Sequence, residues 1–449
     1  MQDLILVSVD DHIIEPPTMF DRHTPVKYKG RMPQVKRTSK GLEVWAVESE
    51  NLVWGAIGLN AVAGRRPEEY GVDPTSYAEM RKGCWDVHAR VDDQNANGIL
   101  ATLNFGTFPL FSGVRFMEYK DQDLALATVQ AYNDWHIDEW CGAYPGRFIP
   151  LGHVPFWNPA ATVEELRRIN AKGCHAITLP PNPTRHGLPS FHNIDYWRPI
   201  LAACDEMGIV LCLHIGDATG AVTSPDAPVD VFITNMPVTL YATAADLLFS
   251  PVLRTFKNIK VALTEGGAGW VPHFLERADY VYRHHSAWTH QDFGGRLPSE
   301  VFLEHVQFCF IDDKTAINAR HACGIDNLTY ECDYPHSDCT FPKAPEVLWE
   351  SIKDLPDEEI EKICYRNANR FYSFDPFRHI PREQCTVGAL RAKATHVDVG
   401  WLNTGHSFGE STRSAKTVSF ETFAKASTPV TFEQYSKDNP VEISTRMSA

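Results

Sequence analysis

The sequence predicts an α/β fold, a (β/α)8 TIM-barrel with a lid insertion after its first strand and a C-terminal extension. Short apolar runs alternate with amphipathic helical stretches along most of the chain, and we count eight such runs. Alternation of this kind is typical of βαβ units around a parallel sheet, and eight units close into a barrel. Hydrophobic residues make up 43% of the chain and charged residues 22%, so a large core can form without disulfide bonds.

The expected elements follow from apolar runs for strands and from helical apolar spacing or capping residues for helices. The expected strands are Leu4–Val9, Ile99–Phe105, Phe148–Val154, His175–Leu179, Val210–His214, Lys260–Thr264, Val306–Ile311 and Leu328–Glu331. The expected helices are Gln122–Gly142, Ala160–Lys172, Tyr196–Met207, Thr239–Phe249, Trp270–Arg283, Ala316–Cys323, Pro345–Asp354 and Asp357–Tyr372. Their order along the chain is that of a barrel in which helices cover the outside.

Two segments fall outside this alternation, one inside the barrel domain of residues 1–390 and one after it. Residues 13–97 are too many for a plain connection and mix Pro, Gly and Trp, so we expect an insertion that serves as a lid over the barrel mouth. Residues 391–449 are polar and rich in Ser and Thr. An ordered polar tail needs a surface, so we expect this tail to lie on its own barrel or on a neighbouring subunit of a homo-oligomer, most simply a dimer.

The charge balance argues against nucleic acid and membrane surfaces as partners. The chain has 57 acidic against 42 basic residues and a net charge of -15, which repels phosphate backbones and anionic lipids. The N-terminus has no basic leader, and no stretch approaches the roughly 20 apolar residues of a membrane span. The eleven cysteines are irregularly spaced, as expected of buried reduced thiols. We therefore expect a cytoplasmic protein that acts on a small molecule.

Four chemistry-bearing residues stand at the ends of expected strands. Asp10 and His12 are two positions apart, so their side chains point to the same side of an extended chain. His214 ends an otherwise apolar strand, and Asp333 follows the last strand. Each has an ordinary explanation, a turn-capping Asp beside a surface His or a core His bonded to a carbonyl. Because the C-terminal strand ends of a barrel meet at one face, the four together predict ligands of a divalent metal.

Two further residues are candidates for the chemistry, and several more were weighed as pocket residues. Glu265 precedes a glycine-rich turn and could bind metal, act as a base, or cap the following helix. His336 follows Asp333 closely and would orient an attacking water or the leaving group. The other candidates are Asn104 and His153 at strand ends, for which packing is an equal alternative, and Arg185, His186 and His192 in the loop after residues 175–179, for which solvation is the default.

The sequence resembles the amidohydrolase-related family that includes aminocarboxymuconate-semialdehyde decarboxylase and the resorcylate decarboxylases. The matching stretches are VDDHIIEPP near the start, LPPNP at 179–183, LHIG at 213–216, EGGAGWVPHFLERAD at 265–279, YECDYPHSD at 330–338 and CYRNANRFY at 364–372. The resemblance covers about residues 4–375 in barrel order. It implies a distorted (β/α)8 TIM-barrel with a metal bound by Asp10, His12, His214 and Asp333, and it leaves the tail unexplained.

Glu265 departs from the pattern of the decarboxylases that the chain resembles, which have a histidine used in proton transfer at that position. A carboxylate there could bind or bridge a second metal, or take a proton from metal-bound water. The EGG sequence is similar to a branch of the family that includes hydrolases and a thioesterase activity. We therefore favour hydrolysis of a thioester, ester or amide by metal-activated water, with the proton handled by Asp333 or Glu265.

Two alternatives stay open. The first is non-oxidative decarboxylation of a hydroxy-aromatic or related acid, in which Glu265 replaces the missing histidine. The second is a metal-binding barrel that has lost catalysis. The metal is zinc, iron or manganese, as one ion or two, because a ligand set rich in carboxylates favours harder ions than a thiolate site does. Aromatic residues in the insertion and early loops, such as Trp45, Phe108 and Trp157, suggest an apolar or aromatic substrate.

Overall fold

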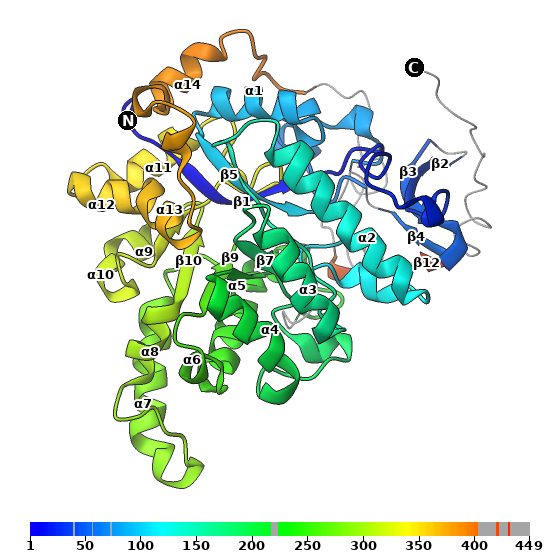
Figure 1. Cartoon of the computed structure of the whole chain (residues 1–449). Helices are drawn as coiled ribbons and strands as arrows, with labels where there is room; N and C mark the ends of the chain where they lie inside the picture. The colour runs from blue at the N-terminus through cyan, green and yellow to red at the C-terminus, as the bar shows by residue number, and fades with distance from the viewer. Residues whose placement is uncertain are drawn as a thin grey trace.

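The computed structural model describes residues 1–38, 41–55, 57–71, 74–216, 223–402, 419–421 and 430–431. Within them the chain forms the predicted α/β barrel, with strands at the centre and helices outside (Figure 1). The barrel strands are β1 Val7–Ile13, β5 Ala101–Gly106, β6 Phe148–Ile149, β7 Ala176–Thr178, β8 Val210–His214, β9 Lys260–Thr264, β10 Val306–Phe310 and β11 Leu328–Tyr330. Each of them overlaps one of the eight predicted strands.

The barrel strands form two parallel sheets that meet at both edges. One sheet has the order β1-β5-β6 and the other the order β11-β10-β9-β8-β7. A parallel bridge between Gly152 and Ile177 joins the sheets beyond β6. At the other junction the backbone N–H of Asp333 donates to the Asp10 carbonyl at 2.8 Å, and that of His12 donates to the Tyr334 carbonyl at 2.7 Å. These bonds place the ends of β1 and β11 side by side.

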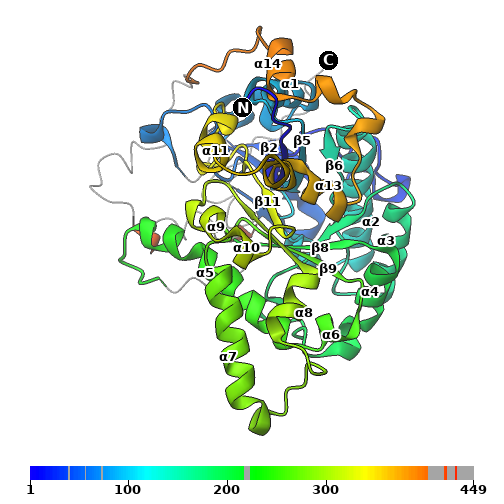
Figure 2. The same ribbon diagram turned by 90° about the vertical axis from the view of Figure 1, so that its left-hand side faces the viewer.

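The helices lie around these strands, and α7 projects away from the barrel in both views (Figures 1 and 2). Their bounds are α1 Val87–Asn97, α2 Gln122–Asp134, α3 Pro159–Asn170, α4 Ile194–Met207, α5 Val229–Phe249, α6 Val252–Thr255, α7 Val271–Thr289, α8 Pro298–His305, α9 Lys314–Asn318, α10 Arg320–Cys323, α11 Ala344–Ile352, α12 Asp357–Glu361, α13 Asn367–Phe371 and α14 Val387–Lys393. Turns of π-helix at Trp135–Cys141 and Lys362–Arg366 extend α2 and join α12 to α13.

Two elements differ from their predicted bounds in ways that affect the site. Strand β1 continues to Ile13, beyond the predicted end at Val9, because a register shift between Ser8 and Asp11 lets the strand continue past an irregular point. Helix α5 begins at Val229, ten residues before the predicted start at Thr239. Pro237 lies inside this helix, and its usual role as a helix breaker explains why the first turns were missed.

Residues 13–97 contain a small antiparallel sheet before the chain returns to the barrel. Its strands are β2 Gln34–Arg37, β3 Glu43–Val47 and β4 Leu52–Trp54. The following loop reaches the end of β11, where the backbone N–H groups of Val62 and Ala63 both donate to the Pro335 carbonyl at 2.9 Å. The range then ends in α1, which packs against α14 and is a barrel helix. The part that approaches the barrel mouth is therefore the loop, and its role as a lid stays a prediction.

The described parts of the C-terminal extension contact the same chain. Arg391 makes two bonds to the carboxylate of Glu346 on α11. Ser419 forms a bridge with Pro228 just before α5, and strand β12, Val430–Thr431, pairs with β4. The remainder of the predicted tail, residues 403–418, 422–429 and 432–449, lies outside the described residues. The prediction of a subunit contact therefore stays a prediction.

Helix α5 is the one helix of the described residues that is long and apolar enough, by length and composition, to cross a membrane. Its second half packs into the barrel core through the buried residues Leu240, Ala244, Leu247 and Leu248. Its first half leaves Val231, Ile233 and Val238 exposed. The apolar composition therefore belongs to a barrel helix that is buried at one end and exposed at the other.

Candidate metal centre

The carboxyl ends of four barrel strands bring the predicted ligands together. Asp10 and His12 lie on β1, His214 is the last residue of β8, Glu265 follows β9, and Asp333 lies three residues beyond the end of β11. Glu265 and Asp333 have left-handed backbone conformations, with φ of 63° and 58°. Few residues other than glycine adopt this conformation, and it is concentrated at functional sites where the surroundings hold it.

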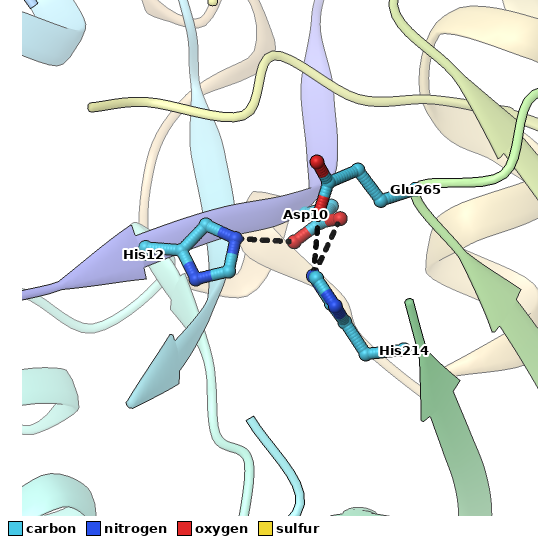
Figure 3. Close-up of side chains that lie close together, drawn as sticks. All are labelled: Asp10, His12, His214 and Glu265. Atoms are coloured by element: carbon cyan, nitrogen blue, oxygen red, sulfur yellow. Dashed lines mark ion pairs between the residues drawn. The ribbon is translucent and has the colours of Figure 1, made fainter. Parts of the chain in front are cut away.

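Two imidazoles and two carboxylates form the first part of the cluster (Figure 3). His214 Nε2 lies 3.2 Å from Asp10 Oδ2 and 3.0 Å from Glu265 Oε2, and His12 Nε2 lies 3.5 Å from Asp10 Oδ1. The ligand atoms of all four lie within 4.8 Å of one another. Such an arrangement of nitrogen and oxygen atoms suits a divalent transition metal.

Asp333 and His336 extend the cluster on the other side of His12. Asp333 Oδ1 lies 3.2 Å from His12 Nε2 and 2.9 Å from His336 Nδ1. The rings of His12 and His336 lie against each other with their centroids 3.8 Å apart. A second set of ligand atoms, from His12, Glu265, Asp333 and His336, again lies within 4.8 Å. The two sets share His12 and Glu265, so the structure allows one ion or a pair.

Burial controls the electrostatics of these side chains. Burial raises the pKa of Asp10 to about 7 and raises the pKa of Asp333 well above its usual range. Burial also lowers the pKa of His336 to about 4 and lowers that of His12 well below its usual range. A bound cation would reverse the effect on the carboxylates, because positive charge favours their ionised form. Neutral imidazole is the form that binds metals, and burial favours it at His12 and His336. Burial acts in the same direction at His214, but the neighbouring carboxylates of Asp10 and Glu265 outweigh it and raise the pKa of that imidazole well above its usual value.

The buried polar atoms of the cluster test whether its residues fit a metal. Both oxygens of Asp10, both oxygens of Asp333, and the Nε2 atoms of His12, His214 and His336 lack a hydrogen-bond partner. Buried polar groups in proteins are almost always satisfied, so such a concentration at one point requires an explanation. A metal ion would satisfy these atoms at once. The residues present therefore fit a divalent metal.

Neighbouring groups orient the ligands. His214 Nδ1 lies 2.5 Å from the Ile215 carbonyl, which fixes the proton on Nδ1 and leaves the Nε2 lone pair for a metal. The guanidinium of Arg90 donates to the carbonyls of His12 and Gly83 and lies 3.9 Å from Asp11. Asp11 accepts a bond from Ser8 at 2.8 Å, so it faces away from the cluster while its neighbours face in.

The other pocket candidates from the sequence do not join the cluster. Asn104 accepts a bond from the Trp140 indole, and the backbone of His153 bonds to Asn133. His192 pairs with Asp246 on the surface at 2.9 Å. Arg185 and His186 lie in a short helical turn, Pro183–His186, and neither is among the described residues that line the cavity beside the cluster.

Sequence reasoning missed two residues of the site. Arg90 supports β1 from α1, and nothing in the sequence distinguishes it from a surface arginine of an amphipathic helix. Glu331 is buried at the end of β11, and its Oε2 accepts a bond from the Glu265 backbone at 3.3 Å. A signal for Glu331 was available, because it is a carboxylate at the end of an apolar strand, where burial is costly unless the group is paired or coordinated.

A cavity of about 550 Å³ opens beside the cluster. Glu265, Glu331 and Asp333 line its inner end, and the first half of α5 lines one side. Leu59 and Tyr70, from the loop between β4 and α1, also line it. A volume of this size is in the range of pockets that bind small organic ligands, and a small-molecule substrate is therefore expected.

Comparison with known proteins identifies the family. The model of the amidohydrolase family matches residues 53–374 of the 449. The chain belongs to the amidohydrolase family. Among curated proteins it is 25% identical over 320 residues to 2-amino-3-carboxymuconate-6-semialdehyde decarboxylase of Dictyostelium discoideum, which covers 69% of this chain and 82% of the relative. The family resemblance found in the sequence is thus confirmed.

Solved structures confirm the fold. An amidohydrolase from Mycobacterium avium subsp. paratuberculosis superposes with a TM-score of 0.62 at 19% identity, over 82% of this chain and 99% of that one. A 5-carboxyvanillate decarboxylase from Novosphingobium aromaticivorans, complexed with manganese, gives 0.56 at 18% identity over 83% and 97%. Family membership and the ligand cluster together confirm the prediction of an amidohydrolase-family enzyme with a site for a divalent transition metal.

The comparisons correct the predicted reaction. We favoured hydrolysis of a thioester, ester or amide because Glu265 stands where the decarboxylases have a histidine. The curated relative is a decarboxylase, and decarboxylases recur among the structural neighbours, so the alternative is better supported than hydrolysis. The physical reason for the error is that one carboxylate at a strand end does not define the reaction. A carboxylic acid can donate a proton as well as accept one.

Proposed function

We propose that this enzyme removes the carboxylate of a hydroxy-aromatic or related carboxylic acid as CO2, without oxidation, at the metal centre. The observation that carries the proposal is the match to a curated decarboxylase over most of both chains, combined with a buried ligand cluster that opens on a cavity. The cluster accounts for metal dependence, and the relative indicates the class of reaction.

Asp10, His12, His214 and Asp333 would hold the metal, since they supply the buried atoms without hydrogen-bond partners. When bound, a divalent cation supplies positive charge that attracts a substrate carboxylate and a neighbouring oxygen and stabilises negative charge in the transition state. The four side chains would hold that ion beside the cavity. Burial keeps bulk water away from them, which strengthens every electrostatic interaction at the site.

We assign the proton transfer to Glu265. Its side chain is the one ligand-cluster member in Figure 3 that is partly exposed, at 14%, and it lines the cavity. The carbon–carbon bond to the carboxylate breaks, CO2 leaves, and the electron pair stays on the substrate carbon. The Glu265 carboxyl then donates its proton to that carbon, and solvent returns a proton to the carboxylate. Oxidation states balance, so the reaction needs no redox partner.

His336 orients Asp333 in this proposal. Its Nδ1 lies 2.9 Å from Asp333 Oδ1, close enough to fix the orientation of that carboxylate. Burial lowers the pKa of His336 to about 4, so the neutral ring adds no positive charge beside Asp333. We therefore assign it a positioning role.

The experiment is decarboxylation of hydroxybenzoates in D2O by manganese-loaded protein. We expect CO2 release and a product that carries one deuterium at the carbon that lost the carboxylate. A Glu265→Gln variant should bind the metal and lose most of the turnover, and Glu265→Asp, which keeps a carboxyl, should retain more. Protein that binds manganese but releases no CO2 from any member of a broad panel of hydroxy-aromatic acids would contradict the proposal and favour a barrel without catalysis.

We also infer a cytoplasmic dimer. All the cysteines are unpaired and Cys339 alone among them is not fully buried, which fits a reducing compartment. Dimer formation rests on the polar composition of residues 391–449, as argued from the sequence. Reactivity of the thiols in unfolded protein tests whether the cysteines are unpaired. Measurement of mass in solution tests whether the protein is a dimer.

A further inference from the structure

The cavity beside the metal centre has one apolar side, which we call the α5 wall. It consists of residues on the first half of helix α5: Val229, Phe232, Ile233, Met236 and Pro237. Ile215, at the end of β8, and Phe310 and Ile311, at the end of β10, continue the apolar lining toward the barrel. Such a surface gains free energy when it packs against the apolar or aromatic body of a ligand.

The charged residues that line the cavity are all acidic, in contrast to the apolar α5 wall, and we call them the acidic side. They are Glu265, Asp312, Asp313, Glu331, Asp333 and Asp338. No Lys or Arg occurs among the described residues that line the cavity. A metal ion at the inner end is therefore the single source of full positive charge among the groups identified there.

The carboxylates away from the metal are fixed by hydrogen bonds. Asp313 accepts from the backbone N–H groups of Ala268 and Gly269 at 2.9 and 2.7 Å, and from that of Ala316 at 2.8 Å. Asp312 accepts from the Ser351 hydroxyl at 3.4 Å. These bonds hold negative charge in place at the end of β10, beyond the metal centre.

The neutral polar residues Asn60 and Ser337 do not supply positive charge to the cavity in place of a Lys or Arg. The Asn60 amide and the Ser337 hydroxyl lie 3.0 Å apart and bond to each other. Asp333, in contrast, is fully buried, lines the cavity and has no partner for either oxygen. The cavity is thus built to receive negative charge at one point, next to Asp333, where a metal would lie.

We propose that the substrate carries a single carboxylate, the one that leaves, on an extended apolar or aromatic body that packs against the α5 wall. Hydroxyl or amino groups at its far end would donate to the acidic side. A second carboxylate there would lie next to Asp312 and Asp338, and the described residues that line the cavity include no Lys or Arg to offset its charge, so dicarboxylic acids are rejected. This inference rests on the proposed function and specifies its substrate class.

The test uses manganese-loaded protein and three unreactive probes of one shape. They are biphenyl-3-carboxylate, the same molecule with a 4′-carboxylate, and the same molecule with a 4′-aminomethyl group. Binding measured by calorimetry should be at least about tenfold weaker for the dicarboxylate than for the monocarboxylate, and equal or tighter for the amine. An Asp312→Asn, Asp338→Asn double variant should reduce the difference in affinity between the monocarboxylate and the dicarboxylate.

A matched control removes negative charge elsewhere. Asp195 on α4 has a side chain that is 92% exposed and does not line the cavity. Asp195→Asn should therefore leave the difference in affinity between the monocarboxylate and the dicarboxylate unchanged. Equal or tighter binding of the dicarboxylate, or no binding of any probe, would overturn the inference. These binding measurements need no turnover, so they test the substrate class separately from the reaction. The preference for a monocarboxylate can be absent in protein that releases CO2, and it can be present in protein that releases none.

Discussion

Asp10 and Glu15 are two buried carboxylates from the same short stretch of chain, and they have opposite surroundings. Both are fully buried, and burial raises the pKa of each to about 7. Glu15 Oε2 accepts from the Phe108 backbone at 2.7 Å, and its Oε1 accepts from the Tyr132 hydroxyl at 2.9 Å. The oxygens of Asp10 have no hydrogen-bond partner and face imidazole nitrogens.

This difference shows what separates a binding group from a structural one. Burial and a raised pKa are common to both residues, so neither property marks a site. A concentration of missing partners at one point does, because buried acceptors without donors are costly unless something outside the chain completes them. Asp10 is therefore assigned to the metal and Glu15 to the fold.

Replacement of Asp10 should have the largest effect. Asp10→Asn keeps the shape but removes the charge, and a neutral amide is a poorer ligand for a divalent cation. We expect metal content to fall well below one equivalent and CO2 release to fall by at least about 10³-fold. Elemental analysis and turnover of the purified variant check this. Full activity in protein that retains no metal would refute the assignment.

Replacement of Glu265 separates its three candidate roles. In Glu265→Gln we expect metal to stay bound while kcat falls by roughly 10²–10⁴-fold, because proton donation is lost. Loss of metal together with turnover would instead make Glu265 a ligand. Normal metal content with normal turnover would make it only a helix cap, and the proton transfer would have to be assigned to another group. Elemental analysis beside steady-state kinetics distinguishes these results.

The architecture was predictable from the sequence, but the selection of the reaction was not. The eight strands were found because buried parallel strands are apolar runs between amphipathic helices. The four proposed ligands were selected because they stand at strand ends, and the structure brings their side chains together. The first half of α5 was missed because Pro237 and an exposed apolar face do not follow the pattern of a soluble helix. Arg90 and the cavity depend on contacts between distant segments, which periodicity does not encode.

Replacement of Glu15 should change stability and its pH dependence, and should leave metal content unchanged. Its pKa of about 7 in the folded state exceeds the value of 4.5 for an unburied Glu, so ionisation destabilises the fold. This loss of unfolding free energy is absent below about pH 4.5, grows as pH rises, and reaches roughly 3 kcal/mol above about pH 7. The Tm of Glu15→Gln relative to wild type should therefore be higher at pH 8 than at pH 5.

A matched variant at an exposed position supports this comparison. Glu164 is exposed on α3, and Glu164→Gln should show no such change with pH. A Tm difference for Glu15→Gln that does not rise between pH 5 and pH 8 would show that Glu15 is not held against its ionised form.

Removal of the tail should have the smallest effect on chemistry. A chain that ends at Leu402 keeps α14 and the ion pair of Arg391 with Glu346 but loses Ser419 and β12. We expect a lower mass in solution, from dimer to monomer, with kcat changed by less than about threefold, because the strand ends are untouched. Light scattering and kinetics check this. An unchanged mass would remove the tail from the subunit contact.

The most direct test of the central claim follows the fate of the carboxylate at the metal centre. A hydroxybenzoate labelled with ¹³C in its carboxyl group is incubated with manganese-loaded wild-type protein and with Asp10→Asn, and ¹³C NMR follows the label. The account predicts one labelled CO2 or bicarbonate per substrate consumed with wild-type protein, and none with Asp10→Asn. Label released equally by both proteins, or substrate consumed while the label stays in an organic acid, would contradict it.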